Sequence, residues 1–309
     1  MADAAALRIV DRISAKTKLF GVVGRPIAHS LSPQIHNTLA AELGADLVYT
    51  AFAPAPEAVR TAFSGLFAAG VSGLNVTMPF KGDAYAFADV RHGEAERFSA
   101  ANTLVLREGA IHAYNTDFDG FVNAFTIQTG ADFAGKRVAI LGAGASCRTL
   151  SHAIAAKGAA AVAIVSRSPE KAGEVAENCR ARFPACRFET FGYADAAART
   201  FFGGCDVIVN TTPVGMGTNQ KILPGGLDFP FQSAHFVVDL IYSPKETFFL
   251  WSARRAGAVA INGLGMLICQ AAIAFTHFTG IPVHEALLAQ MFERFQGYVE
   301  ARDTHNAGS

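Results

Sequence analysis

The sequence is poor in charged residues, and neither sign is in excess. Charged residues make up 17% of the 309 residues, and 26 Lys and Arg balance 26 Asp and Glu, so the formal net charge at pH 7 is zero. A balanced chain without a long basic run is unlike a protein built to hold nucleic acid. Hydrophobic residues reach 51%. This is enough for a large core and excludes disorder as the main state.

Cysteine is also scarce, and its spacing does not suit a disulfide framework or a structural zinc site. The five cysteines are odd in number, lie far apart and contain no Cys-x-x-Cys pair, so we expect inert thiols and no metal. No apolar run approaches the roughly 20 residues that cross a bilayer. The first 18 residues lack the apolar core and cleavage site of a secretory signal. These absences predict a cytoplasmic protein with no membrane partner.

What the chain does contain is an alternation of short apolar runs and amphipathic stretches, which predicts an α/β protein. In the first part the expected elements are strands at 18–23, 47–52 and 73–76 and helices at 32–43 and 56–69. A second series begins near residue 136, with strands expected at 136–141, 161–165, 207–210, 235–240 and 258–261. It has the rhythm of a doubly wound nucleotide-binding sheet. Helices are expected at 265–277 and 283–299.

The strand at 136–141 runs directly into Gly142-Ala143-Gly144-Ala145-Ser146, a local signal for a dinucleotide. Gly142 suits the tight turn and Gly144 the close approach of a pyrophosphate, while the following helix offers free N–H groups to the phosphates. The third glycine of the fingerprint is replaced by Cys147. Because a single Gly-x-Gly also occurs in structural turns, the flanking strand and helix carry much of this prediction.

The end of the next strand distinguishes the two nicotinamide dinucleotides. An NAD site usually places a carboxylate there for the ribose 2′-hydroxyl. This chain has Ser166-Arg167-Ser168 instead, with Lys171 one turn later. Arg167 can pair with a 2′-phosphate and stack on adenine. The sequence therefore predicts NADP(H).

Three other stretches combine small hydroxyls, amides and one lysine in segments expected to follow strands, where open α/β sheets bind ligands. They are residues 24–33, 75–81 and 115–120. Ser30 and Ser32, two residues apart near a helix start, suit a carboxylate. Taken singly, each stretch is also compatible with turn or cap chemistry.

Together, these stretches identify a resemblance to the shikimate dehydrogenase family. Eight motifs occur in the family's order from about Phe20 to about Gln270: GRPIAHSLSPQIHN from 24, NVTMPFK (75–81), AANTL (100–104), NTDFDG (115–120), LGAGASCR (141–148), NTTPVGM (210–216), DLIYSP (239–244) and NGLGMLICQAA (262–272). The resemblance implies reversible NADPH-linked reduction of 3-dehydroshikimate to shikimate, a step of aromatic amino acid (chorismate) biosynthesis.

The resemblance also implies roles for individual residues. Lys81 would be the general acid/base, paired with Asp117. The substrate carboxylate would be bound by Ser30, Ser32 and Tyr242, and the ring hydroxyls by Thr77, Asn102, Asp117 and Gln270. The implied cofactor residues are Gly142, Ala143, Gly144, Ala145, Ser146, Ser166, Arg167, Ser168, Lys171, Thr211, Leu240 and Gly263.

The family layout implies two domains with the active site in the cleft between them. We expect a discontinuous substrate-binding domain (18–118 plus 264–300), a Rossmann-type NADP domain (119–263) and an N-terminal extension (1–17). The expected assembly is a homodimer. The sequence departs from the usual family pattern at Ala145, where glycine is usual, at Ser166 and Ser168, where the pattern is Asn-Arg-Thr, and at His277, where an aromatic residue is usual.

Two other readings of the sequence stay open. A quinate/shikimate dehydrogenase paralogue would act on quinate or a related cyclitol acid. The two serines favour shikimate, because a threonine in that loop would favour quinate. A non-catalytic sensor of pathway metabolites, or a structural adaptor, is the alternative from another class. Binding alone would not require the Lys81–Asp117 pair, which argues against the sensor, and an adaptor would not need every pocket motif.

Overall fold

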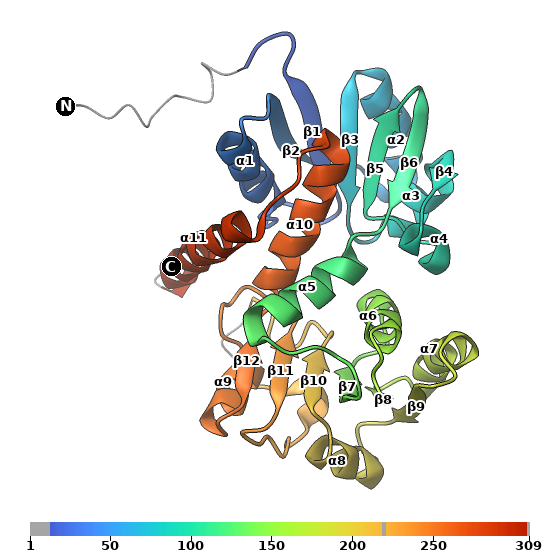
Figure 1. Cartoon of the computed structure of the whole chain (residues 1–309), viewed down its shortest axis with the longest axis vertical. Coiled ribbons are helices and arrows are strands. Elements are labelled where there is room, and N and C mark those ends of the chain that lie inside the picture. Colours follow the sequence, from blue (N-terminus) through green and yellow to red (C-terminus); the bar gives the residue numbers. More distant parts are fainter. Residues whose placement is uncertain (1–12, 218–220, 308–309) are drawn as a thin grey trace, which may run out of the picture. The chain divides into compact units, whose positions relative to one another are not determined.

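Two sheets of six strands each organise the described part of the chain (Figure 1). The computed structural model describes residues 13–217 and 221–307, so most of the N-terminal extension lies outside the described residues. Contacts group the chain into two units. The first ends at Asp117 and resumes over Gln270–Leu288, and the second comprises Phe118–Cys269 and the residues from Ala289 onward. This division places 270–288 in the first unit and 264–269 and 289–300 in the second, whereas the predicted boundaries keep 264–300 together.

The first unit holds a mixed sheet with strand order β2-β1-β3-β5-β6-β4. Its elements in the order of the chain are β1 (Lys18–Val23), α1 (Ser32–Leu43), β2 (Leu47–Phe52), a 3-10 turn (Pro56–Ala58), α2 (Val59–Ala68), β3 (Val71–Val76), α3 (Lys81–Phe87), β4 (Val90–Arg91), α4 (Glu94–Phe98), β5 (Thr103–Arg107) and β6 (Ala110–Tyr114). β1, β2 and β3 are parallel, β5 is antiparallel to both β3 and β6, and β4 is parallel to β6.

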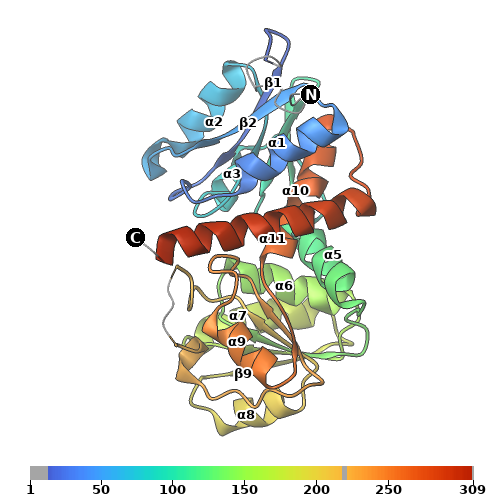
Figure 2. The same ribbon diagram turned by 90° about the vertical axis from the view of Figure 1, so that its left-hand side faces the viewer.

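Alternating side chains of β1 face two apolar layers. Val23 packs in a cluster with Phe63 of α2 and Leu74 of β3, whereas Phe20 and Val22 pack with Tyr49 and other residues on the opposite face. This period-2 pattern is expected for a strand covered on both sides. Figure 2 shows α1 and α2 on opposite sides of β1 and β2.

The second unit holds a fully parallel sheet with strand order β12-β11-β10-β7-β8-β9 (Figure 1). The elements from residue 117 onward are α5 (Asp117–Thr129), β7 (Arg137–Leu141), α6 (Ala145–Ala156), β8 (Ala161–Val165), α7 (Pro169–Arg182), β9 (Arg187–Phe191), α8 (Ala196–Gly203), β10 (Val207–Asn210), a 3-10 turn (Pro224–Gly226), β11 (Phe236–Asp239), α9 (Phe248–Arg255), β12 (Val259–Ile261), α10 (Leu264–Thr279) and α11 (Glu285–Ala307). Counted from β7, this is the 3-2-1-4-5-6 order of dinucleotide-binding sheets. The predicted fold class is therefore confirmed.

No helix within the described ranges has both the length and the hydrophobicity that a membrane span requires.

Candidate active site

Strand direction brings the chemistry-bearing loops of the first unit to one edge of its sheet. The segments with Ser30 and Lys81 follow the parallel strands β1 and β3. Asn102 comes just before β5, which is antiparallel to β3, and Asp117 comes just after β6, which is antiparallel to β5. The ends of β1, β3 and β6 therefore share an edge with the start of β5.

Lys81 and Asp117 form an ion pair at this edge. The Lys81 ammonium donates to Oδ2 of Asp117. Each residue is the first of a helix, α3 and α5 respectively, and the side chains are 26% and 16% exposed. The pair is shielded enough for its charges to interact strongly, yet still accessible to a small molecule.

Asn102 links this pair to Gln270. The Asn102 amide nitrogen donates to Asp117 Oδ1 at 2.9 Å and to Thr116 Oγ1 at 3.0 Å. Its distance to Gln270 Oε1 is 3.5 Å, and the Thr116 hydroxyl lies 3.4 Å from the same oxygen. Asn102 is 3% exposed. The two oxygens of Asp117 thus have separate partners, Asn102 and Lys81.

The two predicted carboxylate-binding serines also contact each other. The Ser30 hydroxyl donates to Ser32 Oγ at 3.2 Å, and Ser30 Oγ accepts from the backbone N–H of Ser32 at the same distance. Thr77 packs so closely on the neighbouring loop that a Cβ at Gly24 would lie 2.3 Å from its methyl group. Thr77 N–H donates to Val23 at 2.9 Å, which holds the two loops together.

Tyr242 belongs to the second unit, in the segment after β11. Burial raises the pKa of its hydroxyl, while the Arg302 charge acts in the opposite direction. Its predicted contact with the substrate carboxylate, shared with Ser30 and Ser32 of the first unit, stays a prediction.

The glycine turn of the second unit follows β7 at the point where the strand order reverses between β7 and β10. Ligands bind at such switch points in doubly wound sheets. Gly142 has φ of 100°, and a Cβ there would lie 2.9 Å from Thr211 Oγ1. The Thr211 hydroxyl donates to the Leu141 carbonyl at 2.7 Å. Glycine is therefore required at 142, and the predicted Thr211 supports the turn.

Helix α6 begins immediately after this turn. A Cβ at Gly144 would meet nothing within 4 Å of protein, so the space above that residue is open. Ala145 is the first residue of α6, and it is exposed, as is Ser146; Ala143 is half-buried. Cys147 is fully buried, with its sulfur 3.7 Å from Ser151 Oγ. A small thiol thus replaces the third fingerprint glycine inside the core.

The turn that follows β8, Ser166–Ser168, contains the cationic side chain of Arg167 and no carboxylate. Ser166 is buried, and its hydroxyl oxygen accepts from the Ser168 N–H at 3.1 Å. Arg167 points out as an exposed residue, and Lys171 is exposed on α7. Burial raises the pKa of Tyr193, while Arg167 lowers it. The arrangement suits a phosphate at this strand end.

Leu240 and Gly263, predicted beside the nicotinamide, are in contact. A Cβ on Gly263 would lie 1.9 Å from the Leu240 carbonyl oxygen, so only glycine allows this approach. The Gly263 N–H donates to Ile241 at 3.1 Å. The contact fixes the backbone on both sides of the turn.

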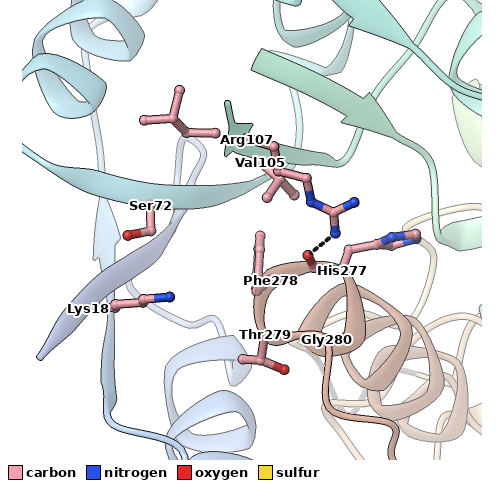
Figure 3. A pocket seen from close by; sticks show the side chains of 9 residues that line it. Lys18, Ser72, Val105, Arg107, His277, Phe278, Thr279 and Gly280 are labelled. Atoms are coloured by element: carbon pink, nitrogen blue, oxygen red, sulfur yellow. Dashed lines mark hydrogen bonds between the residues drawn. The ribbon is translucent and has the colours of Figure 1, made fainter. Parts of the chain in front are cut away.

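A surface pocket of about 310 Å³ lies at the opposite edge of the first sheet, lined by Lys18, Ser72, Val105, Leu106, Arg107, His277, Phe278, Thr279 and Gly280 (Figure 3). Several of its polar groups already have partners. Arg107 Nη2 donates to the His277 carbonyl at 2.6 Å, and the Thr279 hydroxyl donates to Phe275 and accepts from the Ile281 N–H. The Lys18 ammonium and the Ser72 hydroxyl also line the pocket.

Sequence reasoning missed the residues beneath Asn102, namely Tyr49, Asn75, Thr103, Asn115 and Thr116. Four of them lie within the family motifs. Asn75 is in NVTMPFK, Thr103 is in AANTL, and Asn115 and Thr116 begin NTDFDG. The motifs therefore contained these residues next to the predicted site residues. Within the described ranges, no group of three or more His, Cys, Asp or Glu residues could hold a metal ion.

Comparisons with known proteins agree with this geometry. Three family models match: the shikimate dehydrogenase substrate binding domain over residues 22–104, shikimate / quinate 5-dehydrogenase over 125–202, and the shikimate 5′-dehydrogenase C-terminal domain over 263–287. The shikimate dehydrogenase (NADP(+)) of Caldanaerobacter subterraneus subsp. tengcongensis is 38% identical over 269 residues, covering 87% of this chain and 94% of that protein.

Solved structures give the same result. A shikimate dehydrogenase in complex with NADP+ has a TM-score of 0.81 at 33% identity, covering 89% of this chain and 94% of that one. The shikimate 5-dehydrogenase of Listeria monocytogenes, in complex with shikimate and NAD, also has a TM-score of 0.81, at 29% identity, covering 91% of this chain and 98% of that one. With its two sheets, its Lys81–Asp117 pair and these similarities over most of its length, the chain belongs to the shikimate dehydrogenase family.

Proposed function

We propose that this protein is an oxidoreductase that interconverts 3-dehydroshikimate and shikimate with NADP(H), with Lys81 as the general acid/base. The observation that carries the proposal is the Lys81–Asp117 pair, whose carboxylate is shared with Asn102. Membership of the family and the named activity of its relatives support the same reaction.

The NADP(H)-binding residues belong to the second unit. The open space above Gly144 and the exposed Arg167 fit a pyrophosphate and a 2′-phosphate. Ser166, Ser168 and Lys171 complete the proposed phosphate site, and Leu240 and Gly263 hold the nicotinamide end. When bound, the cofactor supplies the hydride to the carbonyl carbon or accepts it back.

Lys81 handles the accompanying proton. Negative charge develops on the carbonyl oxygen during reduction, and a cationic ammonium within hydrogen-bond reach stabilises this charge and donates a proton. In the oxidative direction, the neutral amine takes the proton from the hydroxyl. Asp117 orients the amine, because its Oδ2 accepts from Lys81 while its Oδ1 is held by Asn102.

Substrate binding divides between polar groups of two kinds. Ser30 and Ser32 present hydroxyls to the carboxylate, together with Tyr242, and Thr77, Asn102 and Gln270 present amides and a hydroxyl to the ring. The assignment of these residues, the two-domain boundaries, a homodimer and a cytoplasmic location all remain proposals.

An oxidation assay tests the function. Purified protein is offered shikimate or quinate with NADP+ or NAD+, and reduced cofactor is followed at 340 nm. We expect shikimate with NADP+ to give the highest kcat/KM. Higher kcat/KM with quinate would assign the protein to the quinate branch that one matched family model names, and inactivity in all four pairings would contradict the proposal.

A further inference from the structure

A buried chain of hydrogen bonds extends from Asn102 into the first unit, and the proposed mechanism has not used it. The Tyr49 hydroxyl donates to Asn75 Oδ1 at 2.7 Å, and the Asn75 amide donates to Thr103 Oγ1 at 3.0 Å. The Thr103 hydroxyl donates to Asn102 Oδ1 at 3.0 Å. Tyr49, Asn75 and Thr103 are 2%, 6% and 0% exposed. The chain therefore reaches Asp117 through Asn102, away from bulk water.

The direction of every bond is fixed by backbone groups at two points. Asn75 Nδ2 lies 3.1 Å from the Asn102 carbonyl, which can only accept, so Oδ1 of Asn75 must face Tyr49, and Tyr49 must donate. The Thr103 oxygen then accepts from Asn75, and its own proton is free for Asn102 Oδ1. The Thr116 N–H, which can only donate, reaches the same Oδ1 at 2.9 Å.

This polarity determines what Asn102 presents to the site. Asn102 Oδ1 accepts from two donors, the Thr103 hydroxyl and the Thr116 N–H. If the Asn102 amide rotated by 180°, its NH₂ group would face these two donors and both hydrogen bonds would be lost. Its Nδ2 therefore points to Asp117 Oδ1. Because this bond fixes the rotation of the carboxylate, Oδ2 is left aimed at Lys81.

We propose that Thr103, Asn75 and Tyr49 are positioning residues, which act through Asn102 to orient the Asp117 carboxylate and thereby Lys81. The inference rests on the proposed function. None of the three side chains needs to touch the substrate. Their effect is on the geometry of proton transfer, where a small displacement of the reacting group costs a large factor in rate.

Thr103→Val tests the proposal, because it removes the hydroxyl and keeps the shape. Steady-state oxidation of shikimate with NADP+ is measured from pH 6 to 10. We expect kcat to fall on the order of tenfold, while KM for NADP+ stays within twofold. The acidic limb of the kcat profile should move to higher pH, because the Asn102 amide has then lost one of the two donors that hold its Oδ1 and keeps only the Thr116 N–H, so it offers an N–H to Asp117 less consistently.

Two variants provide the matched controls. Thr103→Ser keeps the hydroxyl and should restore kcat to within about threefold and return the pH profile to that of the wild type. Thr50→Val makes the same change at an exposed position of β2 and should change neither. Should Thr103→Val fail to fold, Tyr49→Phe takes its place, with a smaller loss of kcat and the same direction of profile shift.

Several outcomes would overturn the inference. One is a folded Thr103→Val enzyme with wild-type kcat and pH profile, and another is a Thr103→Ser enzyme as impaired as the valine variant. A stability loss with unchanged kinetics would also overturn it, since that is the result of a purely structural role. Wild-type inactivity on shikimate is a different result, which would overturn the proposed function and the inference with it.

Discussion

The proposed chemistry rests on one side chain, the Lys81 ammonium, held by Asp117. Replacing it by methionine keeps the length and removes the proton. Lys81→Met should lower kcat by about 10²–10⁴-fold, because general acid–base catalysis by one group contributes that much. KM for shikimate should change by only a few-fold, because the serine and amide contacts remain.

Lys157→Met, an exposed position at the end of α6, is the control and should leave both constants unchanged. A Lys81→Met enzyme with kcat within threefold of wild type would remove Lys81 from the mechanism.

His36 is a second residue with a measurable consequence. Its ring is 1% exposed and stacks on Tyr49 with 4.1 Å between ring centroids, and neither of its nitrogens has a hydrogen-bond partner within the described ranges. Burial lowers the pKa of His36 to about 3, although the side chain of Asn75 acts to raise it. The folded protein therefore keeps this histidine neutral well below the ordinary pKa.

Burial of His36 makes the free energy of unfolding depend on pH. Between pH 6.5 and 3 the unfolded chain binds a proton at His36 and the folded chain does not, so this residue makes the free energy of unfolding fall as the pH falls. At pH 5.5 the loss is about 1.4 kcal/mol. His36→Phe should remove that part of the slope in urea unfolding between pH 7.5 and 5.5. Parallel slopes in the two proteins would contradict the assignment.

Site residues within recognisable motifs could be predicted from the sequence, and the residues that support them could not. The hydroxyls of Ser30 and Ser32 suit a carboxylate by their spacing, and the resemblance of the surrounding motifs to the family implies the roles of Lys81 and Asp117. The role of Thr103 depends on which groups surround its hydroxyl in three dimensions. No spacing rule supplies that information, because β5 and β3 are paired only in the folded sheet.

At the scale of single elements, the turn between β8 and α7 should determine the preference for NADP+ over NAD+. Arg167 is exposed there, without a carboxylate in the Ser166–Ser168 turn. Arg167→Ala should raise KM for NADP+ by about 10–100-fold, because a charge-assisted hydrogen bond to phosphate is worth about 1.5–3 kcal/mol. KM for NAD+ should stay nearly constant.

The matched control for this turn is Arg182→Ala, at the exposed far end of the same helix. Equal effects of Arg167→Ala on the two cofactors would show that Arg167 does not read the 2′-phosphate.

The hairpin between β5 and β6 explains where the prediction of elements failed. The predicted limits of the strands at 18–23, 47–52, 161–165 and 207–210 and of the helix at 32–43 agree with the structure, because apolar runs and a Ser-Pro start are strong signals. β4, β5, β6 and β9 were not predicted. The β5–β6 turn is Glu108-Gly109, not the Asn-Gly or Asp-Gly that usually signals a hairpin, and β4 has only two residues.

Glu108 adopts a left-handed backbone conformation with φ of 49°, which asparagine tolerates better. Glu108→Asn should therefore raise the free energy of unfolding by about 1 kcal/mol. Glu108→Gln removes the charge and keeps the unfavourable backbone, so it should change stability little. If both variants gain equally, charge and not backbone conformation is the cause.

For the whole molecule, the balance of charge predicts its behaviour in solution. With 26 residues of each sign, and with histidines other than the buried His36 gaining charge on acidification, repulsion between copies is weakest near pH 7. The second virial coefficient from static light scattering should be lowest near pH 7 and rise at pH 5.5, where histidines carry charge. A minimum more than one pH unit away would show that the distribution of charge, and not its sum, controls association.

The two α/β series were visible in the sequence, and the division of the last helices was not. Periodicity identified α10 and the first part of α11 as amphipathic or apolar helices, but it gives only the direction of an apolar face. Which residues cover that face depends on the folded chain. The contact grouping separates α10 at Gln270 and α11 at Ala289, and no turn signal marks either position.

The chain leaves the first unit at Asp117 and returns to it at Gln270, and both side chains belong to the hydrogen-bonded group around Asn102. The intervening 118–269 segment is thus an insertion whose two attachment points are themselves members of that group. An exchange of this segment between family members would preserve the group intact. Cofactor choice can then be inherited separately from the acid–base chemistry. A chimaera cut at these two residues would keep the acid–base residues of this chain and take the cofactor preference of the donor of the inserted segment.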